Sequence, residues 1–421
     1  MTVVPDFSRT LLKPLGAPSG KVETFIEVPF TVGERSIRPD GIIAVTRAGK
    51  TWGAIVEAKT GPNALEPDQM NAYLDLAREI GADAVLSLSN HFVTAASGYP
   101  IEVDRRKLRK VSLAHWSWVN VLTEAVVVRE HRGVSDPEQA YVLGELIRYL
   151  SDPRSGAVAF DSMGPAWTKV RDGARARTIR RSEPEVDAVA ARWDDLIRFL
   201  ALELTKDLGR NVKQLLPKRE AQPAARRSAL CESLESTGVL YAELSVPDAA
   251  GALSIAADLF ARQVSVSTAV EAPRDGRSKG RVSWLLRQLG DAPEGLRIEA
   301  RVARTQSTLA TTLGEAHAEP GALYPESDKE IRSFLIAMTT PMGLKRSAGR
   351  GSFIDSVLDT TKTFYADVLQ ALRAWKPPPP KMKKPSPEEE SQVPADEAAN
   401  RLPPPDIARP APEESGAPTD V

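Results

Sequence analysis

The chain has 421 residues, of which 42% are hydrophobic and 26% are charged, and its formal net charge is −1. This composition predicts a soluble protein of two or three domains with ample material for apolar cores, and the near-neutral charge argues against a generic nucleic-acid binder. The single cysteine, Cys231, excludes an intramolecular disulfide and fits a reducing compartment. The sequence has no basic and apolar leader and no run that could cross a bilayer, so a cytoplasmic protein without a membrane partner is expected.

The first 130 residues alternate strand-like and helix-like patterns. Strands are predicted at 24–30, 41–45, 51–59 and 83–90, and a helix is predicted at 67–81. Pro67 suits the first helical position, Met70, Leu74 and Ala77 share one face, and Gly81 can close the helix. This order of elements predicts a mixed sheet with a helix packed against it.

The rest of the chain divides into three further segments. Residues 131–227 form a basic helical connector in this interpretation, with amphipathic stretches at 139–150 and 186–204. Within it, residues 151–227 hold 16 Lys and Arg against 11 Asp and Glu, an excess of 5 positive charges. Residues 228–375 are predicted as an α+β domain of unknown role, and residues 376–421, rich in proline and acidic residues, are predicted to be disordered.

The α+β segment combines both periodicities. Strand-like alternation is found at 240–247, 253–260, 262–270 and 296–304, and helices are predicted at 281–289, 328–338 and 352–375. The four predicted parts of the chain are therefore 1–130, 131–227, 228–375 and 376–421.

Charged residues interrupt two apolar strand candidates near the start of the chain. If Ala48-Gly49 is a two-residue turn, paired residues have numbers that sum to 97, and Asp40 lies opposite Glu57. Opposed Cβ atoms are about 4.5–5.5 Å apart, a separation at which two carboxylates repel each other unless a cation lies between them. Strand alternation places Lys59 on the face of Glu57, and hard oxygen ligands favour Mg²⁺ or Mn²⁺ over zinc. A longer turn would shift the register and move every side chain to the opposite face.

These residues resemble those of a known family. The pair PD at 39–40 and the triplet EAK at 57–59, followed by a helix with Gln69 and Tyr73, resemble the PD-(D/E)XK nuclease superfamily. The Gln-x-x-x-Tyr spacing is similar to that of its helicase-associated, exonuclease-like branch. The resemblance covers roughly residues 20–90, and it implies an α/β fold in which an N-terminal, restriction-endonuclease-like mixed sheet is flanked by helices.

The resemblance also implies a role for each residue of the motif. Asp40 and Glu57 would ligate the metal ion, and the backbone carbonyl of Ala58 would add a third oxygen. The ion would hold a phosphate oxygen and lower the pKa of a bound water. Lys59 would orient that water or neutralise charge on the phosphate.

Three further residues complete the expected site. Gln69 and Tyr73, at positions i and i+4 of one helix, would contact DNA or brace the lysine. The family usually has one more acid before the aspartate, for which Glu27 is the first choice and Glu23 the second. That acid is commonly on a helix in the family, whereas residues 24–30 have a strand pattern here.

Other polar residues have simpler interpretations. The basic runs 105–110 and 171–181 are candidates for phosphate contacts, although charge runs are usually solvated faces. His91 is interpreted as a loop residue, and His115 as packed with its tryptophan neighbours.

The sequence therefore predicts a Mg²⁺-dependent nuclease that hydrolyses DNA, with a setting in restriction, phage defence or repair. One alternative is a catalytically silent nuclease-fold protein that binds nucleic acid or a protein. Another makes the C-terminal domain the working part. The sequence leaves open DNA versus RNA, endonuclease versus exonuclease action, sequence preference, homodimer formation, and a protein partner for the C-terminal domain or tail.

Overall fold

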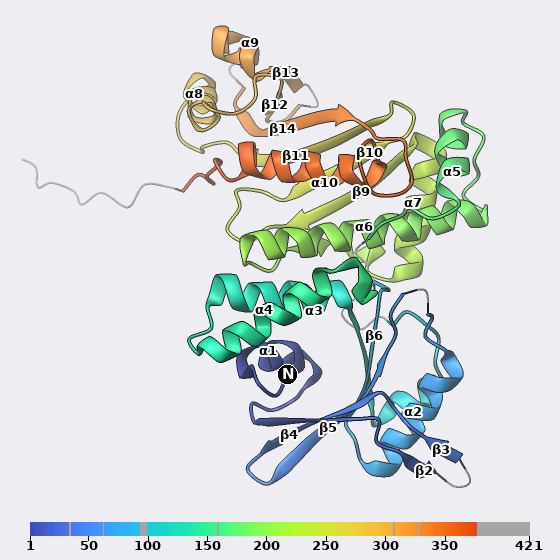
Figure 1. Cartoon of the computed structure of the whole chain (residues 1–421). Helices are drawn as coiled ribbons and strands as arrows, with labels where there is room; N and C mark the ends of the chain where they lie inside the picture. Colours follow the sequence, from blue (N-terminus) through green and yellow to red (C-terminus); the bar gives the residue numbers. More distant parts are fainter. Residues whose placement is uncertain are drawn as a thin grey trace, which may run out of the picture. The chain divides into compact units, whose positions relative to one another are not determined.

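The computed structural model describes most of the chain up to residue 376 (Figure 1). The described ranges are 1–32, 35–61, 63–92, 99–157, 160–305, 308–326 and 329–376. Residues 377–421, for which disorder is predicted, lie outside the described residues. No described helix is both long enough and apolar enough to span a membrane.

The predicted mixed sheet in the first third of the chain is confirmed. This N-terminal sheet has the strand order β1-β4-β5-β6-β7. Its strands are β1 (Lys21–Ile26), β4 (Gly41–Arg47), β5 (Lys50–Ala58), β6 (Ala84–Ser89) and β7 (Ser112–Ser117). β1, β4 and β5 pair antiparallel, whereas β5, β6 and β7 pair parallel. A separate small hairpin joins β2 (Phe30–Val32) and β3 (Arg35–Ile37).

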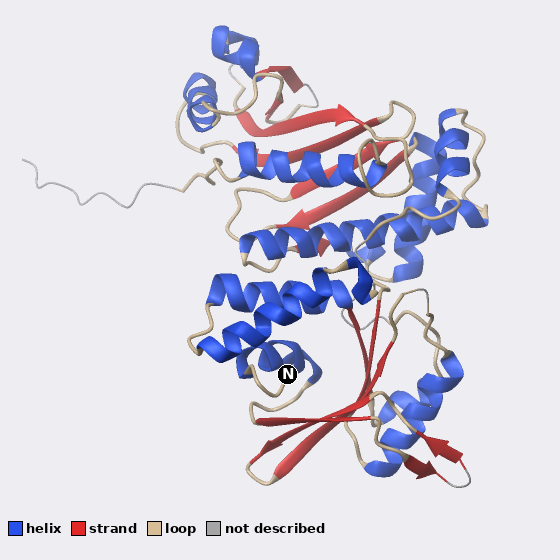
Figure 2. Ribbon diagram, in the orientation of Figure 1, coloured by secondary structure: helices blue, strands red, loops and turns tan. Residues whose placement is uncertain are grey.

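Helices cover both faces of the N-terminal sheet (Figures 1 and 2). One face packs against α1 (Pro5–Leu12), α3 (Trp118–Val126) and α4 (Pro137–Ser151). The other face packs against α2 (Pro67–Ile80), through a core that includes Ile55, Met70 and Leu74. Burial on two faces explains the unbroken apolar runs 52–56 of β5 and 84–86 of β6.

The predicted turn and register of the β4–β5 hairpin are confirmed. Ala48 has φ 49° and Gly49 has φ 76°, as a two-residue turn of the type that suits a twisted hairpin requires. The pairs run from Arg47–Lys50 to Gly41–Val56, and in each pair the numbers sum to 97.

The helix predicted at 67–81 is confirmed, with Pro67 as its first residue and the left-handed Gly81 as its C-cap. The strand predicted at 24–30 differs. β1 ends at Ile26, and Phe30 begins β2. Glu27 has φ 51°, which no regular strand allows, so the chain turns away from the sheet edge there.

The second half of the described chain contains a larger antiparallel sheet. This C-terminal sheet has the order β13-β12-β14-β11-β10-β9-β8. Its strands are β8 (Lys213–Leu215), β9 (Val239–Ser245), β10 (Leu253–Asp258), β11 (Gln263–Glu271), β12 (Arg297–Val302), β13 (Thr308–Thr312) and β14 (Ile331–Pro341). The helices of this half are α5 (Trp167–Arg175), α6 (Pro184–Leu208), α7 (Pro223–Thr237), α8 (Ser278–Gln288), α9 (Leu313–Ala318) and α10 (Phe353–Phe364).

The C-terminal sheet has one face packed against helices. Leu240, Ala242 and Leu244 of β9 are buried together with residues of α6, α7 and α10, whereas alternate positions such as Glu243 stay exposed. The described residues up to Trp375 form one compact unit. β8, from the predicted helical connector, pairs with β9, and the domain boundaries at 130 and 227 stay predictions.

The helix predicted at 328–338 is wrong, because Ile331–Pro341 forms strand β14. A bulge in its pairing with β12, between Arg301 and Val302, shifts the register by one residue. The buried residues Ile331, Phe334 and Ile336 therefore depart from a period of two. The three-residue step from Ile331 to Phe334 fits one turn of a helix as well as a bulged strand.

Candidate functional site

The register of the N-terminal sheet aligns five polar residues in one row. Asp40 precedes β4 and falls opposite Glu57 by the same sum of 97. Glu57 pairs with Ser87 of β6, and Ser87 pairs with His115 of β7. At the other end, the backbone N–H of Glu27 donates to the Asp40 carbonyl at 3.2 Å, which extends the β1–β4 pairing.

Glu57 is the centre of a hydrogen-bonded network and is only 2% exposed. Its Oε1 accepts from Lys59 Nζ at 2.6 Å and from Gln69 Nε2 at 2.8 Å. Its Oε2 accepts from the Tyr73 hydroxyl at 2.8 Å, and Gln69 Nε2 lies 3.1 Å from the same hydroxyl. A buried carboxylate needs such partners, because its desolvation alone costs several kcal/mol.

Helix α2 places two of the four residues in this network. Gln69 and Tyr73 are one turn apart, so both point from α2 toward the sheet. The apolar contact between α2 and Ile55, which shares its strand face with Glu57, fixes the distance from helix to strand. Burial raises the pKa of Tyr73, and the hydrogen bond to Glu57 adds to this effect. Tyr73 therefore remains a hydrogen-bond donor at neutral pH.

Asp40 lies beside the network and is exposed. Its Oδ2 accepts from the backbone N–H of Ala58 at 2.7 Å, which joins the start of β4 to the end of β5. The hydrogen bond to Glu57 raises the pKa of Lys59, and the negative charges of Glu57, Asp40 and Glu66 act in the same direction. Glu66, the exposed N-cap residue of α2, is a further acid near Lys59 that the motif does not include.

The oxygen atoms at this strand end are of the chemical type that binds a hard cation such as Mg²⁺. Glu57 and Asp40 offer carboxylate oxygens, and the Ala58 carbonyl belongs to the same strand end. Mg²⁺ is commonly held by one or two carboxylates and completes its coordination with water and substrate oxygens. Among the described residues, no group of three or more His, Cys, Asp or Glu side chains is arranged to hold a metal ion.

The structure does not bring the expected extra acid to the network. The Glu27 side chain is exposed and pairs with Arg38 at 3.5 Å. The backbone of Glu27 continues the row of polar residues, but its positive φ directs the side chain away from that row. Glu23, the second choice, lies in β1 and pairs with Lys21 at 2.8 Å. In the described part of the chain, neither acid has a contact with Glu57, so the role of an extra acid stays a prediction.

The next strands add a pair that sequence reasoning did not connect. Ser87 Oγ lies 2.7 Å from His115 Nδ1, and His115 Nε2 lies 3.0 Å from the carbonyl oxygen of His91. A carbonyl only accepts, so Nε2 carries the proton and the Ser87 hydroxyl donates to Nδ1. Burial lowers the pKa of His115 to about 4. The ring of Tyr99 packs edge-on against His115 at a centroid distance of 6.0 Å.

This buried histidine predicts an acid-sensitive fold. The unfolded chain takes up a proton on His115 near pH 6.5, whereas the folded chain does so only near pH 4. The contribution of neutral His115 to the free energy of unfolding is fully present above about pH 6.5. It is lost as the pH falls toward 4, by up to about 3 kcal/mol. Urea denaturation at pH 7 and pH 4.5 is expected to show a smaller difference for His115→Gln than for the parent. The exposed His317→Gln variant is the control, and equal pH dependence in all three proteins would contradict the prediction.

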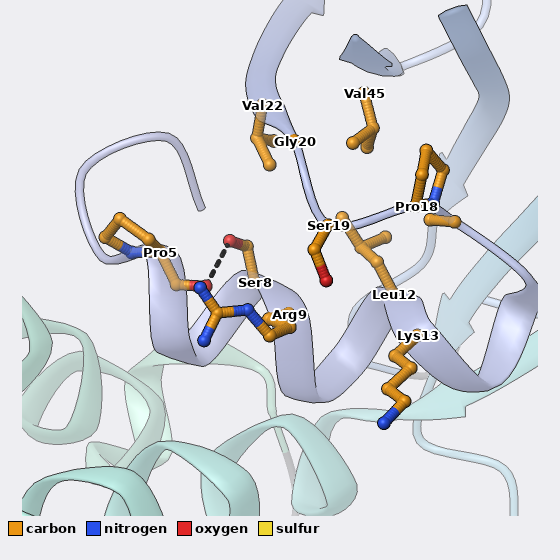
Figure 3. Close-up of a pocket in the computed structure, with 11 residues that line it drawn as sticks. Pro5, Ser8, Arg9, Leu12, Lys13, Pro18, Ser19, Gly20, Val22 and Val45 are labelled. Carbon is orange, nitrogen blue, oxygen red and sulfur yellow. Dashed lines mark hydrogen bonds between the residues drawn. The ribbon is translucent and has the colours of Figure 1, made fainter. Parts of the chain in front are cut away.

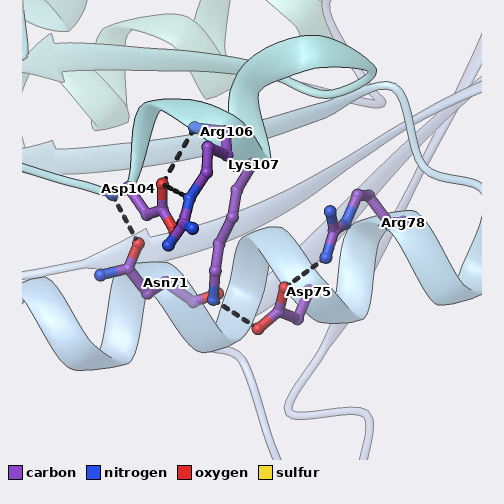
Figure 4. Close-up of polar contacts among 6 residues, drawn as sticks. All are labelled: Asn71, Asp75, Arg78, Asp104, Arg106 and Lys107. Atoms are coloured by element: carbon purple, nitrogen blue, oxygen red, sulfur yellow. Dashed lines mark hydrogen bonds and ion pairs between the residues drawn. The ribbon is translucent and has the colours of Figure 1, made fainter.

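The basic run at 105–110 is partly neutralised (Figure 4). Lys107 pairs with Asp75 of α2 at 2.5 Å, and Arg106 pairs with Asp104 at 2.8 Å. The backbone N–H of Asp104 also donates to Asn71 Oδ1 at 3.0 Å. Within the described residues, these contacts brace the run against α2 and leave the charge of Arg105 without an ion pair.

A cleft of about 680 Å³ lies beside the row of polar residues. Its walls include Tyr99 and His91, which contact His115, together with Arg105, Arg192 and Arg198. By contrast, the pocket between α1 and β1 has a volume of only about 30 Å³ (Figure 3), which is room for about one water molecule. The cleft reaches the His115 end of the row, whereas Asp40, Glu57 and Lys59 are not among its lining residues.

No protein-family model matches the chain, and no curated protein matches it either. The geometry of the network therefore carries the functional argument without support from relatives.

Proposed function

We propose that the chain is a Mg²⁺- or Mn²⁺-dependent nuclease that hydrolyses phosphodiester bonds in DNA. One observation carries the proposal: Asp40, Glu57 and Lys59 meet where β4 begins and β5 ends, and α2 orients Glu57 from one side. A buried carboxylate, an exposed carboxylate and an ammonium group form a site of mixed charge. Such a site can hold a cation and a phosphate together.

Each residue has a defined task in this proposal. Asp40 and Glu57 would hold the cation, with the carbonyl of Ala58 as a further ligand. When bound, the ion supplies Lewis-acid polarisation of the phosphate and a lower pKa for an attacking water. Lys59, kept protonated by its acidic neighbours and 24% exposed, would neutralise charge that develops on the phosphate. Gln69 and Tyr73 hold the Glu57 carboxylate in one orientation.

A lysine comparison tests the proposal. The parent, Lys59→Ala and Lys50→Ala are incubated with supercoiled, linear and single-stranded DNA and with RNA, in Mg²⁺ or Mn²⁺. Lys50 is the exposed first residue of β5, and Lys59 follows directly after the last residue of that strand. We expect cleavage by the parent and by Lys50→Ala, and at least about tenfold slower cleavage by Lys59→Ala. Cleavage that is equal in all three proteins would reject the assigned site.

The substrate panel also separates the alternatives that the proposal leaves open. Cutting of closed circles indicates an endonuclease, and degradation of linear DNA alone indicates an exonuclease. RNA is included because nothing in the network distinguishes the two sugars. A setting in restriction, phage defence or repair, in the cytoplasm, is part of the same proposal.

A second candidate function is a catalytically inactive protein that binds nucleic acid or a protein. The partners of Glu57 favour this candidate. Both carboxylate oxygens of Glu57 already accept hydrogen bonds, and Lys59 already neutralises its charge. A closed ion pair of this kind also occurs in purely structural networks. DNA binding without cleavage by the parent, in either metal ion, would support this candidate over the nuclease.

A further inference from the structure

The loop between β14 and α10 holds a group of exposed cations that the network at Glu57 does not use. Residues 343–352 read GLKRSAGRGS, and the side chains of Lys345, Arg346 and Arg350 are exposed. Within the described residues, Arg346 and Arg350 make no ion pair, and Lys345 Nζ donates only to the carbonyl oxygen of Arg350 at 3.1 Å.

Backbone hydrogen bonds hold this loop in one conformation. The N–H of Met163 donates to the Arg346 carbonyl at 2.9 Å, and the N–H of Ala348 donates to the Asp161 carbonyl at 2.7 Å. The two ends of the loop also meet, since a Cβ on Gly343 would lie 2.0 Å from the Ser352 carbonyl oxygen. Only glycine fits there. An exposed loop that is fixed by its backbone presents its charges at little entropic cost.

A buried aromatic contact anchors the loop to the core. Trp167 begins α5 and Phe353 begins α10, and their ring centroids are 4.3 Å apart. The two helices therefore start side by side (Figure 1). One turn further along α5, Arg171 donates to the carbonyl oxygen of Leu344. The basic stretch at 171–181 and the basic loop are thus neighbours, although about 170 residues separate them in the sequence.

Cations from three segments gather around this contact. The hydrogen bond from Arg171 lowers the pKa of Asp172, and the charges of Arg262 and Arg175 lower it further. Asp172 pairs with Arg171 at 2.8 Å, and Asp355 accepts from the N–H of Gly349 at 3.0 Å. The basic surface is defined here as the following six residues: Arg171, Arg175, Arg262, Lys345, Arg346 and Arg350. With Asp161, Asp172 and Asp355 beside them, the local balance remains +3.

We propose that the basic surface binds the phosphate backbone of nucleic acid. The choice of nucleic acid as the polyanion rests on the proposed function, whereas the surface itself lies outside the Glu57 network. Exposed Lys and Arg side chains on a loop whose backbone is held in place bind phosphates through charge and counterion release, without reading the bases. The chain has a net charge of −1, so such binding needs a local cluster of cations rather than the overall charge.

A charge-reversal experiment tests the proposal. The variant Lys345→Glu/Arg346→Glu/Arg350→Glu is compared with Arg274→Glu/Arg277→Glu/Lys279→Glu, which reverses three exposed charges in the loop before α8 and in the first turn of that helix. Binding to a fluorescein-labelled 30-base-pair duplex and to a 30-nucleotide single strand is measured by anisotropy in EDTA, which prevents metal-dependent cleavage. We expect at least about tenfold weaker binding, and a salt dependence reduced by about 2–3 phosphate contacts, only for the first variant.

The outcomes separate this surface from the proposed nuclease. Equal loss of DNA binding in both variants, or loss in neither, would reject the proposal that the basic surface binds nucleic acid, whether or not the parent cleaves DNA. Loss confined to the first variant supports the surface even if the parent never cleaves, in which case only the nuclease fails. Vesicles containing 30% phosphatidylserine form a second arm, and loss of vesicle binding with unchanged DNA binding would indicate a membrane surface instead. If the triple variant does not fold, Arg346→Glu alone is used, with about threefold weakening expected.

Discussion

Glu57→Gln is expected to slow metal-dependent DNA cleavage by at least about 100-fold, because the cation and Lys59 both lose the charge that holds them. Glutamine has nearly the same size, so the contacts of Glu57 with Gln69 and Tyr73 can be kept in part. Its amide donor would face other donors, and the fold is expected to lose only about 1–3 kcal/mol. Cleavage rates and thermal melting of the purified variant measure the two effects separately.

Glu66→Gln is the matched control for this variant. Glu66 is an exposed acid near Lys59 and makes no side-chain cap to α2. Its replacement is expected to change cleavage less than about threefold, because it influences the site only through a screened charge. A folded Glu57→Gln protein that cleaves DNA at the parental rate would remove Glu57 from the catalytic site.

Arg226→Ala is expected to reduce the free energy of unfolding by about 3–5 kcal/mol, because it removes the ion pair of the buried acid Asp194 and leaves the buried acid Glu220 with only its longer, 3.4 Å pair to the exposed Arg219. Arg226 is 2% exposed, and its Nη1 and Nε lie 2.7 Å from Glu220 and 3.2 Å from Asp194. Its guanidinium also lies 4.6 Å from the ring centroid of Tyr241. Urea denaturation measures the change.

The neighbouring residue of α7 provides the control. Arg227 is 43% exposed and pairs with Asp187 at 3.5 Å, so Arg227→Ala is expected to cost less than about 1 kcal/mol. Similar losses in both variants would show that the buried network adds nothing beyond an ordinary surface pair.

The sequence predicted the local part of the candidate site and not its wider surroundings. The β4–β5 register depends on a two-residue turn, and α2 depends on a proline, a left-handed glycine and an apolar stripe, all of which lie within a few residues of the elements they define. The sequence predicted that Gln69 and Tyr73 contact DNA or brace Lys59. In the structure both hydrogen-bond to Glu57, and this meeting follows from the same local elements. The position of the extra acid was harder to predict. The strand pattern of the sequence continues to residue 30, whereas the backbone turns at Glu27.

Pairings between distant segments were not predictable in the same way. Ser87 and His115 are neighbours only because β6 and β7 pair in parallel, and no local pattern fixes which strands become neighbours. The bulge in the pairing of β12 with β14 interrupts the two-residue period of β14, so the sequence predicted a helix there. The Arg226 network likewise joins side chains from α6, α7, β9 and a turn between them.

The compact span of the Glu57 network has a consequence for how it assembles. Its members, Glu57, Lys59, Gln69 and Tyr73, and the neighbouring Asp40 fall within one hairpin and the helix that follows. Short loops close at low entropic cost, and contacts between nearby segments form early in folding. The ion pair and its supporting hydrogen bonds can therefore assemble on a growing chain before the second sheet has been synthesised.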